Sequence, residues 1–186
     1  MFEELIARIG NELEKADLPY MIIGGQAVLL YGTPRMTNDI DITLGIDTGG
    51  LERIVEAVED IGLEIIPEDF RSFVEKTYVL PTRDQRSGIR VDFIFSFTPY
   101  ERQAIARAKR VDLLNAGIMF AAVEDVIIHK IFAGRPRDLE DVRSILIKKR
   151  CLDREYIRRW LTEFERSPEK AGLTEAFEQV LRGIER

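Results

Sequence analysis

The sequence predicts an α+β fold in which a small mixed β-sheet flanked by helices precedes a helical C-terminal part. Two observations support this class. Short apolar or alternating runs of strand length are interspersed with amphipathic helical patterns in the first two thirds, and the last third contains helical patterns alone. We expect residues 1–122 to form an α/β core and residues 123–186 to form a helical subdomain packed on that core.

The N-terminal elements are predicted by periodicity and by the residues that interrupt it. Apolar residues at helical spacing indicate a helix over 2–16, which Pro19 ends. The apolar run 20–23 has the length of a strand and stops at Gly24-Gly25, after which 26–31 has a helical pattern. Residues 38–44 alternate polar and apolar side chains, as in a half-buried strand.

The remaining elements follow the same logic. Gly62 ends one helix, a polar turn joins two strands, and Gly134 and Pro136 separate two helices. The expected helices are 51–61, 99–108, 123–133, 137–149, 153–165 and 172–184, and the expected strands are 75–80, 89–97 and a short edge strand at 118–122.

Composition excludes several classes of protein. The 186 residues are 45% hydrophobic and 32% charged, which is typical of a globular chain rather than a disordered one. A single cysteine, Cys151, cannot form an internal disulfide, and a single histidine, His129, excludes His-rich metal sites and most His-based triads. No apolar run is long enough for a membrane span, and the acidic N-terminus lacks a cleavage site, so we expect a cytoplasmic protein without membrane partners.

Charge is distributed unevenly along the chain. Between Lys130 and Arg159, ten Lys and Arg residues face five acids, so this segment carries +5 while the whole chain carries −6. A basic segment on an acidic protein can attract an anionic ligand such as a nucleotide or RNA. Solvated helix faces are the alternative explanation.

The stretch that carries chemistry is residues 22–42. A strand runs into Gly24-Gly25 and a helix follows, an arrangement that brings backbone N–H groups against a phosphate. Asp39 and Asp41 stand two residues apart in a predicted strand, so their carboxylates project from one face. Such neighbours repel one another unless a cation lies between them.

A third acid, Asp92, interrupts the apolar strand sequence IRVDFIF. A carboxylate in that setting is unfavourable unless it is paired or bound to metal. Three carboxylates on neighbouring strands can hold two divalent ions, for which Mg²⁺ is the natural choice and Mn²⁺ an alternative. A solvent-facing, charged strand edge is the competing interpretation.

These residues resemble the nucleotidyltransferase superfamily with the DNA polymerase β-like fold, in its minimal, AbiEii-like type IV toxin-type branch. The resemblance covers residues 18–145 and is carried by an hGG turn, an Arg-x-Thr, an Asp-x-Asp strand and a later single-Asp strand. The matching residues here are Gly24, Gly25, Arg35, Thr37, Asp39, Asp41 and Asp92. The segment 124–142 is similar to the helix pair that follows the sheet in that branch, and it contributes Lys130, Arg137, Asp138 and Asp141.

The resemblance implies a role for each matching residue. Asp39 and Asp41 would hold metal, and Asp92 would be a general base or a further metal ligand. Gly24 and Gly25 would cradle a triphosphate through backbone N–H groups. Lys130 would contact phosphate or compensate acidic charge, with an exposed helix lysine as the alternative. The remaining nucleotide-binding candidates are Arg35, Thr37, Arg137, Asp138 and Asp141, although Arg35 could only brace the acidic strand and the last three could form a helix surface pair.

The implied activity is metal-dependent transfer of an NMP group from an NTP to a hydroxyl, with release of pyrophosphate. The acceptor could be RNA such as tRNA, a protein or a small molecule. Positioning and charge neutralisation dominate such chemistry, so the scarcity of His and Cys is compatible with it. The alternatives are a non-catalytic nucleotide-binding or partner-binding module of the same fold, or the toxin of a toxin–antitoxin pair with an antitoxin protein as partner.

Overall fold

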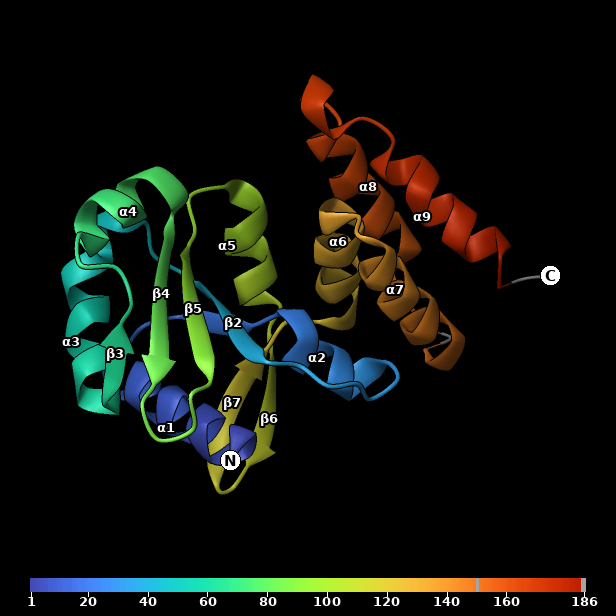
Figure 1. The fold of residues 1–186 in the computed structure, drawn as a ribbon. Helices are drawn as coiled ribbons and strands as arrows, with labels where there is room; N and C mark the ends of the chain where they lie inside the picture. The colour runs from blue at the N-terminus through green and yellow to red at the C-terminus, as the bar shows by residue number, and fades with distance from the viewer. Residues whose placement is uncertain (150, 185–186) are drawn as a thin grey trace. The chain divides into compact units, whose positions relative to one another are not determined.

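The computed structural model describes residues 1–149 and 151–184, which separate into two compact units (Figure 1). The sheet unit comprises Met1–Gly25 and Met36–Ala121, and the helical unit comprises Gln26–Arg35 together with the chain from Ala122 onward. The mixed α/β architecture that the sequence predicts is confirmed. The expected boundary after residue 122 stays a prediction, and the grouping of residues 26–35 with the C-terminal helices departs from it.

The described part of the sheet unit contains a mixed seven-stranded sheet of order β3-β4-β5-β2-β1-β7-β6. Its strands are β1 (Tyr20–Ile22), β2 (Asp39–Leu44), β3 (Leu63–Ile65), β4 (Val79–Asp84), β5 (Arg90–Phe95), β6 (Lys109–Leu113) and β7 (Ala116–Phe120). Its helices are α1 (Phe2–Lys15), α3 (Leu51–Ile61), α4 (Phe70–Thr77) and α5 (Pro99–Ala106), with a 3₁₀ turn η1 (Thr48–Gly50).

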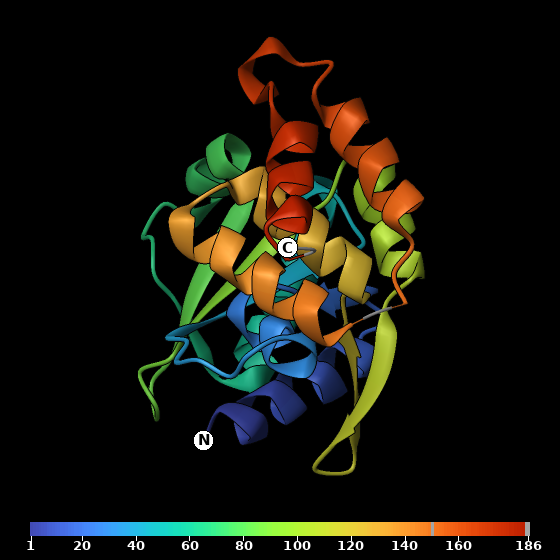
Figure 2. The ribbon, with the colours of Figure 1, turned by 90° about the vertical axis from the view of Figure 1, so that its right-hand side faces the viewer.

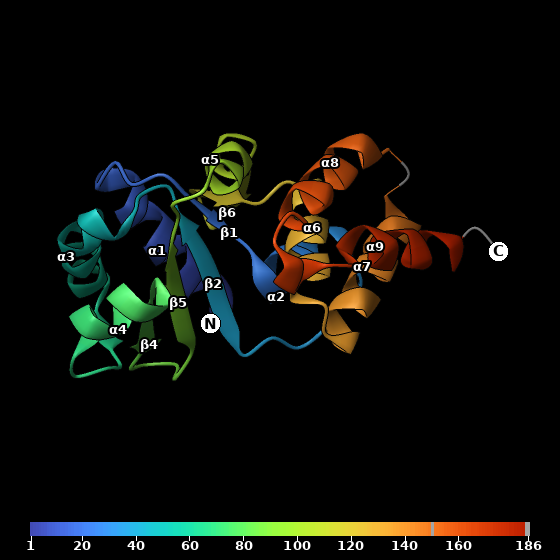
Figure 3. The same cartoon turned by 90° about the horizontal axis from the view of Figure 1, so that it is seen from above.

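The core of the sheet unit lies where α1 and α3 pack together beside the sheet, α1 against β7 and α3 against β3 (Figure 3). The buried residues recur on one side of each helix, as at Ile9 and Leu13 of α1 and Ile54 and Val58 of α3. Burial of these apolar side chains is the main favourable term for this unit. The strand pair β2 and β5 lies between β4 and β1.

Two predicted elements of the sheet unit need correction, and two strands were not predicted. Residues 75–77 belong to helix α4, so the predicted strand 75–80 begins only at Val79. The predicted edge strand 118–122 is β7, which lies inside the sheet between β1 and β6. Two short strands, β3 and β6, form the actual edges and were not predicted; neither carries a run of buried apolar side chains.

The helical unit contains α6 (Val123–Ala133), α7 (Pro136–Lys148), α8 (Arg154–Phe164), α9 (Leu173–Arg182) and a 3₁₀ turn η2 (Pro168–Lys170). Helix α2 (Gly24–Tyr31) begins at the last two residues of the sheet unit's first segment and continues into the helical unit. Helix α6 packs against α7, α8 and α9, which Figure 2 shows together. A buried hydrogen bond of 2.8 Å from Tyr156 Oη to Asp125 Oδ1 joins α8 to α6.

In the described part of the chain, no helix is a candidate for a membrane span. None of its helices combines the length and the apolar character that a span would need.

Candidate active site

Two parallel strands, β2 and β5, bring the three predicted acidic residues onto one face of the sheet unit. Their register pairs Asp41 with Asp92 and Asp39 with Arg90. Ile40 and Ile42, which alternate with the two acids on β2, are fully buried, whereas Asp39 is exposed and Asp41 half-buried. The two-residue period of the strand therefore places Asp39 and Asp41 on one face and Ile40 and Ile42 on the other, as predicted. We call Asp39, Asp41 and Asp92 the carboxylate cluster.

Gly24 lies directly against the carboxylate cluster. It has a φ of +64°, in the left-handed region, and a Cβ placed on it would overlap Asp41 Oδ2 and stand 3.0 Å from Asp41 Cγ. The adjoining Ile23 N–H donates to the Asp41 carbonyl at 2.9 Å, so the turn is tied to β2. Only glycine fits this position, because it combines the required φ with the absence of a side chain.

Arg90 supplies positive charge to the carboxylate cluster. Its Nε donates to Asp92 Oδ1 at 2.8 Å. The hydrogen bond to Asp92 raises the pKa of the Arg90 guanidinium, and the charges of Asp39 and Asp41 act in the same direction. Sequence reasoning missed this residue, although an arginine two positions before Asp92 in a strand had to share its face.

The carboxylate cluster offers the type of oxygen ligand that a divalent ion such as Mg²⁺ prefers. Mg²⁺ prefers carboxylate oxygens and is usually held by one or two carboxylates, with phosphates and water as its other ligands. Within residues 1–149 and 151–184, no group of three His, Cys, Asp or Glu side chains is arranged to hold a metal on its own. Asp41 and Asp92, which are register partners, nevertheless supply carboxylate oxygens of the kind that Mg²⁺ binds.

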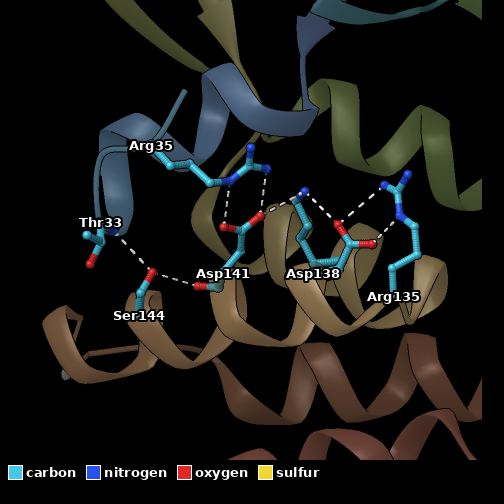
Figure 4. A network of polar contacts seen from close by, with 7 residues as sticks. Thr33, Arg35, Arg135, Asp138, Asp141 and Ser144 are labelled. Carbon is cyan, nitrogen blue, oxygen red and sulfur yellow. Dashed lines mark hydrogen bonds and ion pairs between the residues drawn. The ribbon is translucent and has the colours of Figure 1, made fainter. Parts of the chain in front are cut away.

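Three of the predicted site residues from the C-terminal part, Lys130, Asp138 and Asp141, lie in the helical unit. They belong to an ionic network that also includes Arg35 and Arg135 (Figure 4). Arg35 binds Asp141 through two hydrogen bonds of 2.8 and 2.9 Å. Lys130 Nζ lies 2.8 Å from Asp138 Oδ1 and 3.0 Å from Asp141 Oδ2. Arg135 Nε donates to Asp138 at 2.6 Å.

Burial distinguishes this ionic network from the surface pairs expected from the sequence. The Lys130 side chain is only 6% exposed, so the alternative of an exposed helix lysine is wrong. Asp138 and Asp141 are buried too, so their carboxylates do not lie on the helix surface; Arg137 is exposed beside them. Thr37, by contrast, lies half-buried in the irregular segment of the sheet unit before β2.

The segment 32–35 is anchored within the helical unit by further polar contacts. The Thr33 N–H donates to Ser144 Oγ at 3.1 Å, and Ser144 Oγ donates to the Asp141 carbonyl at 2.8 Å (Figure 4). Lys148 Nζ donates to the Gly32 carbonyl at 2.7 Å. Arg35 thus braces an acidic residue, Asp141 on α7.

The ionic network predicts a loss of stability in acid. Burial raises the pKa values of Asp138 and Asp141, but hydrogen bonds from Arg135, Arg35 and Lys130 outweigh it, and both pKa values fall below the ordinary 3.8. A carboxyl with a lowered folded-state pKa stabilises the fold above its unfolded pKa, and this contribution disappears as the pH falls through the folded value.

We therefore expect the free energy of unfolding to be level near neutral pH and to fall below about pH 4. Urea denaturation between pH 7 and pH 3 measures it. The variant Asp141→Asn, less stable at pH 7, should show a shallower decline. An equally steep decline in that variant would show that Asp141 contributes nothing to the acid sensitivity.

The match to a protein family identifies the class of protein as a nucleotidyltransferase. The chain belongs to the family described as "Nucleotidyltransferase of unknown function (DUF6036)", which matches residues 1–175. No curated protein matches the sequence. The resemblance that the sequence motifs indicate is thereby confirmed at the level of nucleotidyltransferases, and the AbiEii-like branch stays a prediction.

Solved structures share the fold. The antibiotic-resistance factor ANT(2'')-Ia is 16% identical with a TM-score of 0.57, and the match covers 98% of this chain and 94% of that one. An antigenic nucleotidyltransferase-like protein from Paracoccidioides brasiliensis is 14% identical with a TM-score of 0.57, covering 94% and 92%. At these identities the likeness concerns the fold alone.

Proposed function

We propose that this nucleotidyltransferase moves an NMP group from an NTP to a hydroxyl acceptor and releases pyrophosphate, using a divalent metal ion at the carboxylate cluster. The observation that carries the proposal is the register pairing of Asp41 with Asp92 on one face of β2 and β5, with Asp39 alongside. The close approach of the Gly24 backbone to the Asp41 carboxylate supports it, because this approach places the Gly24-Gly25 turn beside the carboxylate cluster.

Each residue of the site has a task in this reaction. Asp39 and Asp41 would hold the metal, and Asp92 would be a further ligand or the base that accepts the hydroxyl proton. When bound, a divalent ion neutralises phosphate charge and stabilises the pyrophosphate leaving group. The acceptor oxygen forms a bond to the α-phosphorus while the bond from that phosphorus to the bridging oxygen breaks. Gly24 and Gly25 cradle the triphosphate through backbone N–H groups.

The contacts in the helical unit favour a structural role for Lys130, Arg35, Asp138 and Asp141 over the predicted nucleotide binding. Each makes at least one ion pair of 3.0 Å or less inside that unit. These pairs also weaken the argument from the basic segment, since Lys130, Arg135 and Arg158 are committed to acidic partners. An RNA acceptor such as tRNA is therefore no better supported than a protein or a small-molecule acceptor.

The nature of the acceptor is open to direct test. A structure of ANT(2'')-Ia in complex with adenylyl-2''-tobramycin, 18% identical to this chain, has a TM-score of 0.57. This complex is a reason to include small hydroxyl compounds among the acceptors tested. Purified protein is incubated with Mg²⁺ and each α-labelled NTP in turn, with total RNA, lysate protein or a metabolite pool as acceptor. We expect label in one pool only.

The control variants separate chemistry from folding. The double variant Asp39→Ala/Asp41→Ala should abolish transfer, whereas Asp112→Ala, which removes an exposed acid from β6 in the same sheet, should leave it unchanged. Mg²⁺-dependent NTP binding without transfer to any pool would favour the non-catalytic module. Growth arrest on expression that depends on Asp39 would favour the toxin. Full activity of the double variant would contradict the assignment of the site.

A further inference from the structure

Arg90 contacts the carboxylate cluster from within the same strand. It stands two residues before Asp92 on β5 and directly opposite Asp39 on β2. Its Nε donates a 2.8 Å hydrogen bond to Asp92 Oδ1, which is one of the oxygens that the proposed reaction requires. A guanidinium and a divalent ion would therefore compete for this carboxylate.

Exposure indicates which partner of this ion pair can leave. The Arg90 side chain is 52% exposed, whereas the Asp92 side chain is 16% exposed. Arginine can therefore turn into solvent, where a guanidinium is well hydrated, while Asp92 stays on the sheet. A partly exposed ion pair of this kind is weak, and a doubly charged ion attracts the same carboxylate more strongly.

We propose that Arg90 is an internal counter-ion that holds Asp92 when no divalent ion is bound and is displaced when the ion enters. The proposal rests on the proposed function and adds a positioning residue that sets the concentration of divalent ion at which the site fills. Without a cation near them, the three carboxylates would repel one another. Arg90 relieves that repulsion in the metal-free protein and orients Asp92 at its register position beside Asp41.

Mn²⁺ binding to the nucleotide-free protein tests this role without relying on activity. The free Mn²⁺ signal in electron paramagnetic resonance gives the dissociation constant for the wild type and for Arg90→Gln. We expect the variant to bind Mn²⁺ about fivefold more tightly, because it lacks both the competing ion pair and the repelling charge. The variant Arg90→Lys keeps a cation near Asp92 and should stay close to the wild type.

Arg83 provides the matched control. It is the register partner of Arg90 on β4, it is exposed, and it lies one strand farther from the carboxylate cluster. The variant Arg83→Gln removes the same charge without removing a contact to Asp92. We expect its Mn²⁺ affinity to stay within about twofold of the wild type, since exposed charges on a protein surface interact only weakly in water.

The outcomes separate this inference from the proposed function. Mn²⁺ binding and transfer by the wild type, with unchanged affinity in Arg90→Gln, would overturn the role of Arg90 alone. An equal gain in Mn²⁺ affinity in Arg83→Gln would also overturn it, since the loss of one positive charge near the cluster would then explain the effect without the contact to Asp92. A wild type that neither binds Mn²⁺ nor transfers label would overturn both proposals. Thermal unfolding of each variant checks that the sheet is retained.

Discussion

The substitution Gly24→Ala should reduce nucleotidyl transfer about 100-fold, a loss of the size seen when one electrostatic group of an active site is removed. The added methyl would overlap Asp41 Oδ2, so the Asp41 carboxylate would have to leave its place beside Asp92. The φ of +64° adds a conformational cost of about 1 kcal/mol for a residue with a Cβ.

Gly62→Ala is the matched control for backbone strain. Gly62 ends α3 with a φ of +80°, and a Cβ on it would meet no atom within 4 Å. Both variants carry the conformational cost, but only Gly24→Ala disturbs a carboxylate, so the comparison of their transfer rates isolates the contact. Equal activity of the two variants would mean that the position of Asp41 is irrelevant to transfer and would contradict its assignment.

Helix boundaries were the most predictable part of the fold. The bounds of α3 and α6 coincide with the predicted 51–61 and 123–133, because Gly62 and Gly134 adopt left-handed conformations that end a helix. Short strands were less predictable. Strand β6 is half-exposed and β3 has only three residues, so their pairing with neighbours, and not their own sequence pattern, makes them strands.

The carboxylate cluster was accessible from sequence for a similar reason. A strand's period of two places Asp39 and Asp41 on one face without any knowledge of the tertiary structure. The register that sets Asp41 beside Asp92 is different, because it depends on a parallel pairing between residues about fifty positions apart. The spacing of Arg90 and Asp92 on one strand places both side chains on the same face, but their contact was not predicted.

The ionic network was beyond sequence reasoning. Arg35 and Asp141 are separated by 106 positions, and the pairing exists only because residues 26–35 join the C-terminal helices. The spacing of Arg137 and Asp141 instead indicated a local pair on the helix surface. Local spacing gives no measure of burial, and burial decides whether a charged residue on a helix serves the surface or the interior.

Loss of the Lys130 charge should therefore destabilise the protein strongly. The variant Lys130→Met keeps much of the side-chain volume but leaves Asp138 and Asp141 with one fewer partner in a buried setting. Breaking a buried ion pair by removing one partner costs about 3–5 kcal/mol of unfolding free energy. Urea denaturation at pH 7 measures this difference, and we expect a correspondingly lower midpoint.

Arg135→Gln is the control, because Arg135 binds the same Asp138 carboxylate with a side chain that is 74% exposed. An exposed partner contributes about 1 kcal/mol or less, so this variant should unfold close to the wild type. A lysine that serves a nucleotide would give a different result: Lys130→Met would then keep its stability to within about 1 kcal/mol and lose transfer. The two variants together thus decide whether Lys130 holds the helical unit together, as its contacts with Asp138 and Asp141 indicate, or binds phosphate, as the sequence motif implied.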